Sequence, residues 1–170
     1  MTRCAVIGAG AWGTALADLL ARNGHEVRIW AYEWDVVESI NRSRQNRRFL
    51  AGHPLSDSLT AFNDIGDTLE GADLVTLATP SHVLRAITRA ASGFVPDGVP
   101  VVVASKGIED KTLALMTDVA AEELPGSTVV ALSGPSFAAE VIAQQPTAVV
   151  VASRSGDAAL FAQQAFSSKH

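Results

Sequence analysis

The sequence has few of the residues that build disulfide frameworks, metal sites or membrane spans. Its 170 residues include one cysteine, Cys4, so no disulfide can form within the chain. The four histidines are scattered and lack the spacing of metal ligands. No apolar run approaches the roughly 20 residues that a membrane helix needs. Met1-Thr-Arg-Cys4 leads directly into an apolar segment, so we also expect no signal peptide. These scarcities favour a cytoplasmic protein with no membrane insertion and no metal.

Charge is also scarce, at 18% of residues, whereas hydrophobic residues make up 48%. Such a composition predicts a well-buried core rather than disorder. The formal net charge of −5 argues against nucleic-acid binding. One basic run, Arg42–Arg48, departs from this balance, and we interpret it as a solvated face. We expect Cys4, beside the first strand, to be a buried structural thiol.

A glycine motif near the start organises the rest of the chain. An apolar run, Ala5–Ile7, predicts a buried strand, and an amphipathic helix pattern follows Gly8-Ala-Gly10-Ala-Trp-Gly13. In this spacing Gly8 permits a tight turn, Gly10 lets the backbone approach a pyrophosphate, and Gly13 lets the helix pack closely on the strand. The strand and helix on either side of the glycines predict dinucleotide binding.

The end of the second predicted strand carries Tyr32 and Glu33. An acidic residue there typically accepts hydrogen bonds from the adenosine ribose and repels a 2′-phosphate. Glu33 follows Gly8 by 25 residues, somewhat more than the typical spacing of about 20. Glu33 therefore favours NAD over NADP, and the alternative is an exposed loop glutamate without this role.

Apolar strands alternate with helical patterns along the whole chain, which predicts a Rossmann-type doubly wound α/β fold. We expect a mostly parallel sheet with helices on both faces and one dinucleotide-binding domain over residues 1–170. Ser81 is expected to cap the helix that runs to Arg89. The predicted strands are 26–31, 59–62, 73–79, 100–105, 128–133 and 147–152 after the first, and the predicted helices beyond the glycine turn are 34–40, 65–69, 81–89, 113–124, 137–143 and 157–166.

Several predicted strands end in polar or glycine-containing segments that should share one edge of the sheet. Lys106 follows a buried strand, where it could neutralise an anionic substrate or simply be a surface lysine. Ser133-Gly134-Pro135-Ser136 could offer backbone N–H groups to an anion or be an ordinary turn. Trp12 either packs along the cofactor or acts as a structural wedge.

Four stretches together resemble one family. Gly8–Ala17, Asn46–Leu50, Ala104–Ile108 and Leu132–Ala138 are similar to segments of the bacterial NAD(P)-dependent glycerol-3-phosphate dehydrogenases, in order and from about Arg3 onward. The resemblance implies the interconversion of sn-glycerol 3-phosphate and dihydroxyacetone phosphate, which supplies glycerophospholipid synthesis. It implies roles in cofactor binding for Ala11, Trp12, Tyr32, Glu33, Phe49, Lys106 and Ala138, and in substrate binding for Lys106, Gly134 and Ser136. It also implies that Phe49 and the arginines beside it form part of the nucleotide cleft, whereas composition alone indicates a solvated face.

The resemblance also implies a second, helical domain that carries the proton-acceptor lysine. We expect that domain to be missing from this chain, and Lys169 is not assigned its role. The fragment would then bind NAD or NADP without turnover. Two alternatives stay open: a stand-alone NAD(P)-binding sensor and another dehydrogenase of the β-hydroxyacid type. A homodimer is compatible with the sequence.

Overall fold

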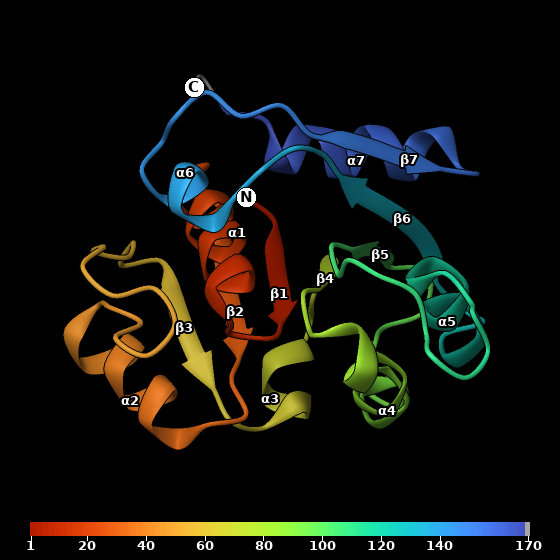
Figure 1. The fold of residues 1–170 in the computed structure, drawn as a ribbon, viewed down its shortest axis with the longest axis horizontal. Helices are drawn as coiled ribbons and strands as arrows, with labels where there is room; N and C mark the ends of the chain where they lie inside the picture. Colours follow the sequence, from red (N-terminus) through yellow and green to blue (C-terminus); the bar gives the residue numbers. More distant parts are fainter. Residues whose placement is uncertain (169–170) are drawn as a thin grey trace.

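The computed structural model describes residues 1–168, so Lys169 and His170 lie outside the described residues. Its central feature is a seven-stranded sheet in the order β3-β2-β1-β4-β5-β6-β7 (Figure 1). The strands are β1 (Arg3–Ile7), β2 (Glu26–Trp30), β3 (Leu59–Phe62), β4 (Leu74–Leu77), β5 (Pro100–Val103), β6 (Thr128–Ser133) and β7 (Val150–Ser153). The helices are α1 (Ala11–Arg22), α2 (Trp34–Ser43), α3 (Ile65–Leu69), α4 (Ser81–Ala91), α5 (Met116–Glu123), α6 (Ala138–Ile142) and α7 (Gly156–Phe166).

The first six strands run parallel, in the order that defines the Rossmann fold. The predicted fold class is therefore confirmed. β7 differs, because it pairs antiparallel with β6. The five-residue helix α6 packs against α1 instead of crossing the sheet. β7 therefore begins at the same end of the sheet at which β6 finishes.

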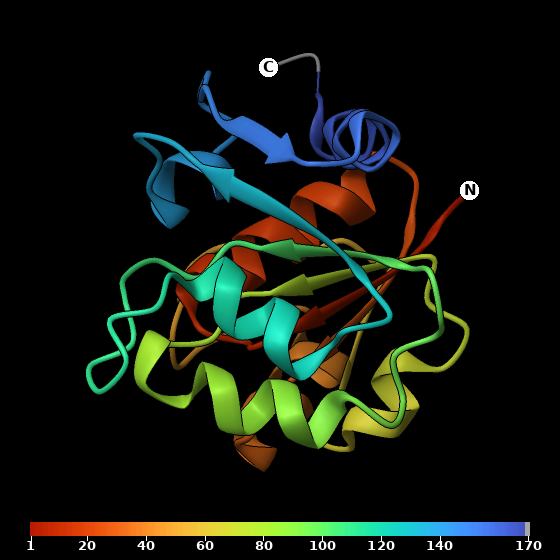
Figure 2. The ribbon, with the colours of Figure 1, turned by 90° about the vertical axis from the view of Figure 1, so that its right-hand side faces the viewer.

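Helices cover both faces of the sheet, and each face has its own apolar core (Figure 2). In β1, Cys4 and Val6 face the layer that contains α1, α2, α6 and α7, whereas Ala5 and Ile7 face α3, α4 and α5. All four side chains are fully buried. This two-sided burial explains why the strand is apolar without alternation.

Several helix ends differ from the prediction, and two of the differences have a clear backbone cause. Ser81 is the first residue of α4 rather than its cap; Pro80 takes the capping position without a side-chain hydrogen bond. Helix α5 begins at Met116, because Leu113 has a left-handed φ of 58° and Leu115 is the extended N-cap. A left-handed residue cannot continue an α-helix, so the predicted start at 113 is wrong by three residues.

Cys4 lies buried in β1, as expected of a structural thiol. Burial, reinforced by the nearby Asp73, raises the pKa of the Cys4 thiol to about 12. The thiolate is the reactive form, so this thiol is inert near neutral pH. No helix among residues 1–168 is long and apolar enough to span a bilayer.

A cluster of ion pairs joins α4 to α5 and to the segment after β5. The Arg85 guanidinium donates from Nε to Glu109 at 2.7 Å and from Nη1 to Glu123 at 2.8 Å. Arg89 also donates to Glu123, at 2.8 Å. Arg85 holds the pKa of Glu109 at about 2, and Arg89 together with Arg85 holds that of Glu123 at about 2, from an ordinary value of 4.5.

These depressed pKa values predict acid sensitivity of the α4–α5 contact. A carboxylate whose pKa is lowered by folding stabilises the fold above its unfolded pKa, and this contribution is lost as the pH falls through the folded value. We expect the melting temperature to fall between pH 4.5 and about pH 2, and Arg85→Ala to make that fall shallower. Thermal melts across this range provide the measurement. Arg42→Ala removes an exposed pair with Glu38 and should leave the slope unchanged; an equal slope in wild type and Arg85→Ala would contradict the prediction.

Candidate functional site

The turn between β1 and α1 requires two of its glycines for steric reasons. Gly8 has a φ of +117°, and a Cβ there would lie 2.8 Å from the carbonyl oxygen of Ala78. A Cβ on Gly13 would lie 1.8 Å from the carbonyl oxygen of Gly8. Gly13 therefore lets α1 pack directly on the turn, as the sequence motif predicts.

Gly10 has a different environment from Gly8 and Gly13. A Cβ on Gly10 would meet no atom within 4 Å, and its φ of −66° is open to any residue. Gly10 is the N-cap of α1, so no side chain satisfies the first N–H groups of the helix. The space above Gly10 therefore faces free donors and the positive end of the helix dipole, an arrangement that fits a pyrophosphate.

Three segments meet beside the start of α1. Trp12 Nε1 donates to the carbonyl oxygen of Ala104, just past β5, at 3.1 Å. Lys106 places Nζ 5.5 Å from the centroid of the Trp12 ring and donates to the carbonyl oxygen of Gly134 at 3.3 Å. The structure thus brings Trp12, Lys106 and Gly134 together, although they are far apart in the sequence. Trp12 is anchored by its hydrogen bond and also presents a ring face to Lys106.

Ser136 and Ala138 extend this group toward α6. The Ser136 side chain is buried, and its backbone N–H donates to the carbonyl oxygen of Gly134 at 3.0 Å. That N–H is therefore engaged within the turn and is not a free anion donor. Ala138, the first residue of α6, packs against the core layer that contains α1, as Ala11 and Trp12 also do. Each of these residues lies at the same end of the sheet as the glycine turn.

The other end of the predicted cofactor site contains Tyr32, Glu33 and Phe49. Tyr32 is 78% exposed and packs edge-on against Trp30, with ring centroids 6.4 Å apart. Glu33 is the N-cap of α2, and its Oε1 lies 3.7 Å from Nη2 of Arg48. The Arg48 guanidinium lies over the Phe49 ring, 5.3 Å from its centroid. The basic run is thus largely paired: Arg42 with Glu38, Arg44 with Asp57, and Arg48 with Glu33 and Asp35.

Sequence reasoning missed the residue that joins these two parts of the site. Asn46 is fully buried, and its Nδ2 donates at 2.8 Å both to the carbonyl oxygen of Ala9 and to Oγ1 of Thr14. Its Oδ1 accepts from the backbone N–H of Phe49 at 3.0 Å. Asn46 therefore fastens the loop that carries Phe49 to the glycine turn. The family resemblance includes Asn46 in the stretch Asn46–Leu50 without giving it a role, and its partners Ala9 and Thr14 lie more than 30 positions earlier in the chain.

Asp18 fastens the same loop farther along α1. Its buried carboxylate accepts from the backbone N–H of Ser56 at 2.7 Å and pairs with Arg22, which also donates to the carbonyl oxygen of Pro54. Burial raises the pKa of Asp18, and the hydrogen bond from Ser56 and the charge of Arg22 oppose that rise. The loop after α2 is thus fixed to α1 at two points.

Replacing Asn46 by alanine should weaken cofactor binding as well as the fold. The change leaves buried polar groups without partners, which costs about 1–3 kcal/mol of unfolding free energy. It also frees Phe49 from the glycine turn, so we expect weaker NADH binding by about tenfold. Denaturant unfolding and a fluorescence titration provide the two measurements.

Asn41→Ala is the matched control for Asn46→Ala. Asn41 makes two hydrogen bonds to the backbone of Ala61, at 2.9 and 2.8 Å, which join α2 to β3 away from the glycine turn. We expect Asn41→Ala to lower stability without a matching loss of NADH affinity. Equal losses of affinity in the two variants would show that Asn46 acts only through general stability.

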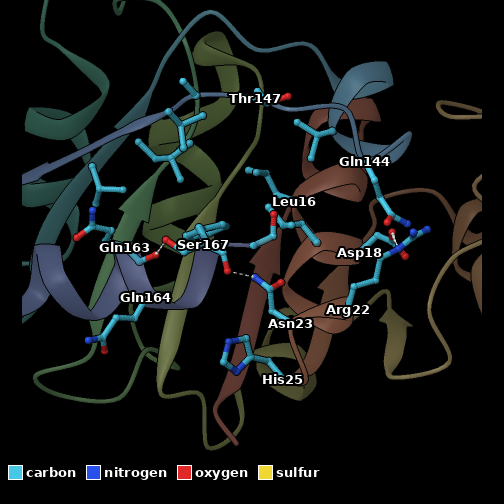
Figure 3. Close-up of a pocket in the computed structure, with 18 of the residues that line it drawn as sticks. Leu16, Asp18, Arg22, Asn23, His25, Gln144, Thr147, Gln163, Gln164 and Ser167 are labelled. Atoms are coloured by element: carbon cyan, nitrogen blue, oxygen red, sulfur yellow. Dashed lines mark hydrogen bonds and ion pairs between the residues drawn. The ribbon is translucent and has the colours of Figure 1, made fainter. Parts of the chain in front are cut away.

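One cavity of the structure lies largely apart from the predicted cofactor site. It encloses about 910 Å³ between α1, the chain after α6, β7 and α7, and of the predicted site residues only Trp12 lines it (Figure 3). Asn23 borders it and donates to the carbonyl oxygens of Ala165 and Ser167, at 2.8 and 3.1 Å. A second cavity, of about 350 Å³, lies beside Tyr32. Among the described residues no group of histidine, cysteine, aspartate and glutamate side chains is arranged to hold a metal ion.

Comparisons with known proteins agree with this geometry. Residues 3–159 match the family model of the NAD-dependent glycerol-3-phosphate dehydrogenase N-terminus. The chain is 45% identical over 166 residues to a glycerol-3-phosphate dehydrogenase [NAD(P)+] of Myxococcus xanthus, covering 96% of this chain and 50% of that protein. It is equally identical, over 168 residues, to the enzyme of that name from Syntrophotalea carbinolica, covering 97% of this chain and 50% of that protein.

Solved structures give the same result. The crystal structure of glycerol-3-phosphate dehydrogenase from Coxiella burnetii superposes with a TM-score of 0.92 at 32% identity, covering 99% of this chain and 51% of that one. A ketopantoate reductase from Ralstonia eutropha, with a TM-score of 0.61 and 24% identity, shares the fold only. The chain spans about half the length of the curated relatives it matches.

Proposed function

Because the chain belongs to the NAD-dependent glycerol-3-phosphate dehydrogenase family, whose N-terminal region it matches, we propose that it binds NAD or NADP for that reaction. The reaction interconverts sn-glycerol 3-phosphate and dihydroxyacetone phosphate and supplies glycerophospholipid synthesis in the cytoplasm. The observation that carries the proposal is the open N-terminus of α1 above Gly10, at the carboxyl edge of the parallel strands. Dinucleotides bind at this edge in doubly wound sheets.

Different residues along the edge of the sheet bind different parts of the cofactor. Ala11 and Trp12 lie beside the pyrophosphate position at the start of α1, and Tyr32, Glu33 and Phe49 hold the adenosine end. When bound, the nicotinamide supplies the hydride carrier of the reaction. Ala138 packs against the same core layer as Ala11 and Trp12, and we assign it to the same cofactor site.

Lys106 is the residue proposed to recognise the substrate. Its ammonium group has an aromatic ring and one carbonyl oxygen as partners and no carboxylate among its contacts in residues 1–168. An ammonium without a counter-ion can neutralise a substrate phosphate. Gly134 and Ser136 shape the adjoining turn, so Lys106, Gly134 and Ser136 form the proposed substrate contact.

We also propose that residues 1–170 form one dinucleotide-binding domain and that the proton acceptor belongs to a second, helical domain. The matched relatives are about twice as long as this chain, which supports that division. Hydride transfer to a ketone needs a proton relay as well as a hydride carrier. The 170-residue chain should therefore bind cofactor without turnover.

A tryptophan-fluorescence titration with NADH, alone and then with glycerol 3-phosphate, tests the proposal. We expect saturable quenching by NADH, because Trp12 lies beside the proposed pyrophosphate site. We then expect glycerol 3-phosphate, but not glycerol, to shift the signal, and Lys106→Met to abolish that shift. Unquenched emission with NADH and NADPH would overturn the proposal. Binding of NADH with no response to glycerol 3-phosphate would favour a nucleotide sensor or a dehydrogenase for another substrate.

A further inference from the structure

Resting on the cofactor function just proposed, we propose that Arg48 is the residue that lets this domain accept NADP as well as NAD, by pairing with the 2′-phosphate. Glu33 alone favours NAD, because a carboxylate at the end of β2 repels that phosphate. The structure adds a guanidinium from a different segment, 3.7 Å from the Glu33 carboxylate. The adenosine end therefore presents both signs of charge.

Arg48 is held in place from two sides. Its Nη1 lies 3.3 Å from each carboxylate oxygen of Asp35, and its guanidinium lies over the Phe49 ring. Phe49 is itself fixed, because its backbone N–H donates to the buried Asn46 side chain. The guanidinium is thus kept near the proposed ribose end before any cofactor binds, so only a short movement is needed to reach a 2′-phosphate.

The partners of Arg48 are easily exchanged. The side chains of Arg48 and Asp35 are half or more exposed, and the contact with Glu33 is long. Exposed ion pairs of this kind contribute little to stability. A phosphate dianion offers the guanidinium two parallel, charge-assisted hydrogen bonds, which are stronger than either contact. With NAD, Glu33 accepts the ribose hydroxyl and Arg48 stays on Asp35; with NADP, Arg48 moves to the 2′-phosphate.

The neighbouring Arg47 provides a charge-matched control. It lies in the same loop and is exposed, and within residues 1–168 its backbone N–H donates to the Ser39 hydroxyl at 3.4 Å while its guanidinium makes no ion pair. Arg47→Ala and Arg48→Ala change the net charge equally. If Arg48 contacts the 2′-phosphate specifically, only Arg48→Ala should weaken NADPH binding relative to NADH. If the arginines attract anions in general, both variants should weaken it equally.

The test is a titration of wild type, Arg48→Ala and Arg47→Ala with NADH and with NADPH, followed by tryptophan emission. We expect Arg48→Ala to raise the ratio of the NADPH to the NADH dissociation constant by about tenfold or more. Arg47→Ala should leave that ratio unchanged. Adenosine 2′,5′-bisphosphate should compete with NADPH on the wild type and lose about the same factor on Arg48→Ala.

The outcomes separate this inference from the proposed function. Binding of both cofactors to the wild type with an unchanged ratio in Arg48→Ala would overturn the role of Arg48 alone. The same change of the ratio in Arg47→Ala would show that the effect comes from net charge alone, and would also overturn the role of Arg48. Binding of NADH with no binding of NADPH to the wild type would overturn it too. A wild type that binds neither cofactor would overturn the proposed function itself.

Discussion

Gly10→Val should abolish dinucleotide binding and leave the protein folded. The valine side chain meets no protein atom near its Cβ, and the extended backbone of Gly10 suits a β-branched residue. We expect the free energy of unfolding to change by less than about 1 kcal/mol. The same side chain fills the space where a pyrophosphate would approach α1, so NADH affinity should fall by about a hundredfold or more.

Gly93→Val is the control for Gly10→Val. Gly93 also has no atom within 4 Å of its Cβ position, but it follows α4 and lies far from the start of α1 in the sequence. We expect Gly93→Val to bind NADH as the wild type does. Urea unfolding and the fluorescence titration measure stability and affinity separately. Wild-type affinity in Gly10→Val would place the cofactor somewhere other than the glycine turn.

Gly13→Ala, unlike Gly10→Val, should lower the stability of the fold itself. The added Cβ would overlap the carbonyl oxygen of Gly8, which is backbone and cannot rotate away. Relief requires α1 to move off β1, and this separates side chains of the two elements that share one buried apolar cluster. We expect a loss of more than about 3 kcal/mol in the free energy of unfolding.

Gly156→Ala is the matched control for Gly13→Ala. Gly156 is the first residue of α7, and a Cβ there meets no atom within 4 Å. Alanine is the better helix former, so Gly156→Ala should be neutral or stabilising by up to about 1 kcal/mol. Urea denaturation followed by circular dichroism measures both variants. If Gly13→Ala were as stable as the wild type, the close packing of α1 on the turn would be wrong.

Much of the fold was predictable because local patterns and tertiary environment agree. The apolar runs of β1 and β5 predict strands buried on both faces, as does the run of β4, which only Thr76 interrupts, and the structure confirms all three. The glycine spacing predicts the close contact between α1 and β1, which is confirmed by the position of Gly13. Errors occurred where backbone geometry overrides composition, as at Leu113, whose left-handed conformation delays α5.

The pairings within the site were less predictable. Lys106 and Ser136 were placed at the correct edge of the sheet, because parallel strands end together. Their partners were not apparent, since the Lys106 contacts with Trp12 and Gly134 join segments about 90 and about 30 residues apart. Composition alone indicates a solvated face for Arg42–Arg48, and the resemblance implies that the arginines beside Phe49 belong to the cleft. Neither identifies the ion pairs of Arg48 with Glu33 and Asp35.

The sequence by itself determined the Rossmann architecture and the edge of the sheet that carries the site. These follow from periodicity and from glycine spacing, which act over a few residues. Only the tertiary structure decided that Asn46 fastens the Phe49 loop to the glycine turn and that Arg48 lies beside Glu33. Such contacts depend on how separate segments pack, and a hydrogen bond or ion pair between distant residues leaves no periodic trace in the chain.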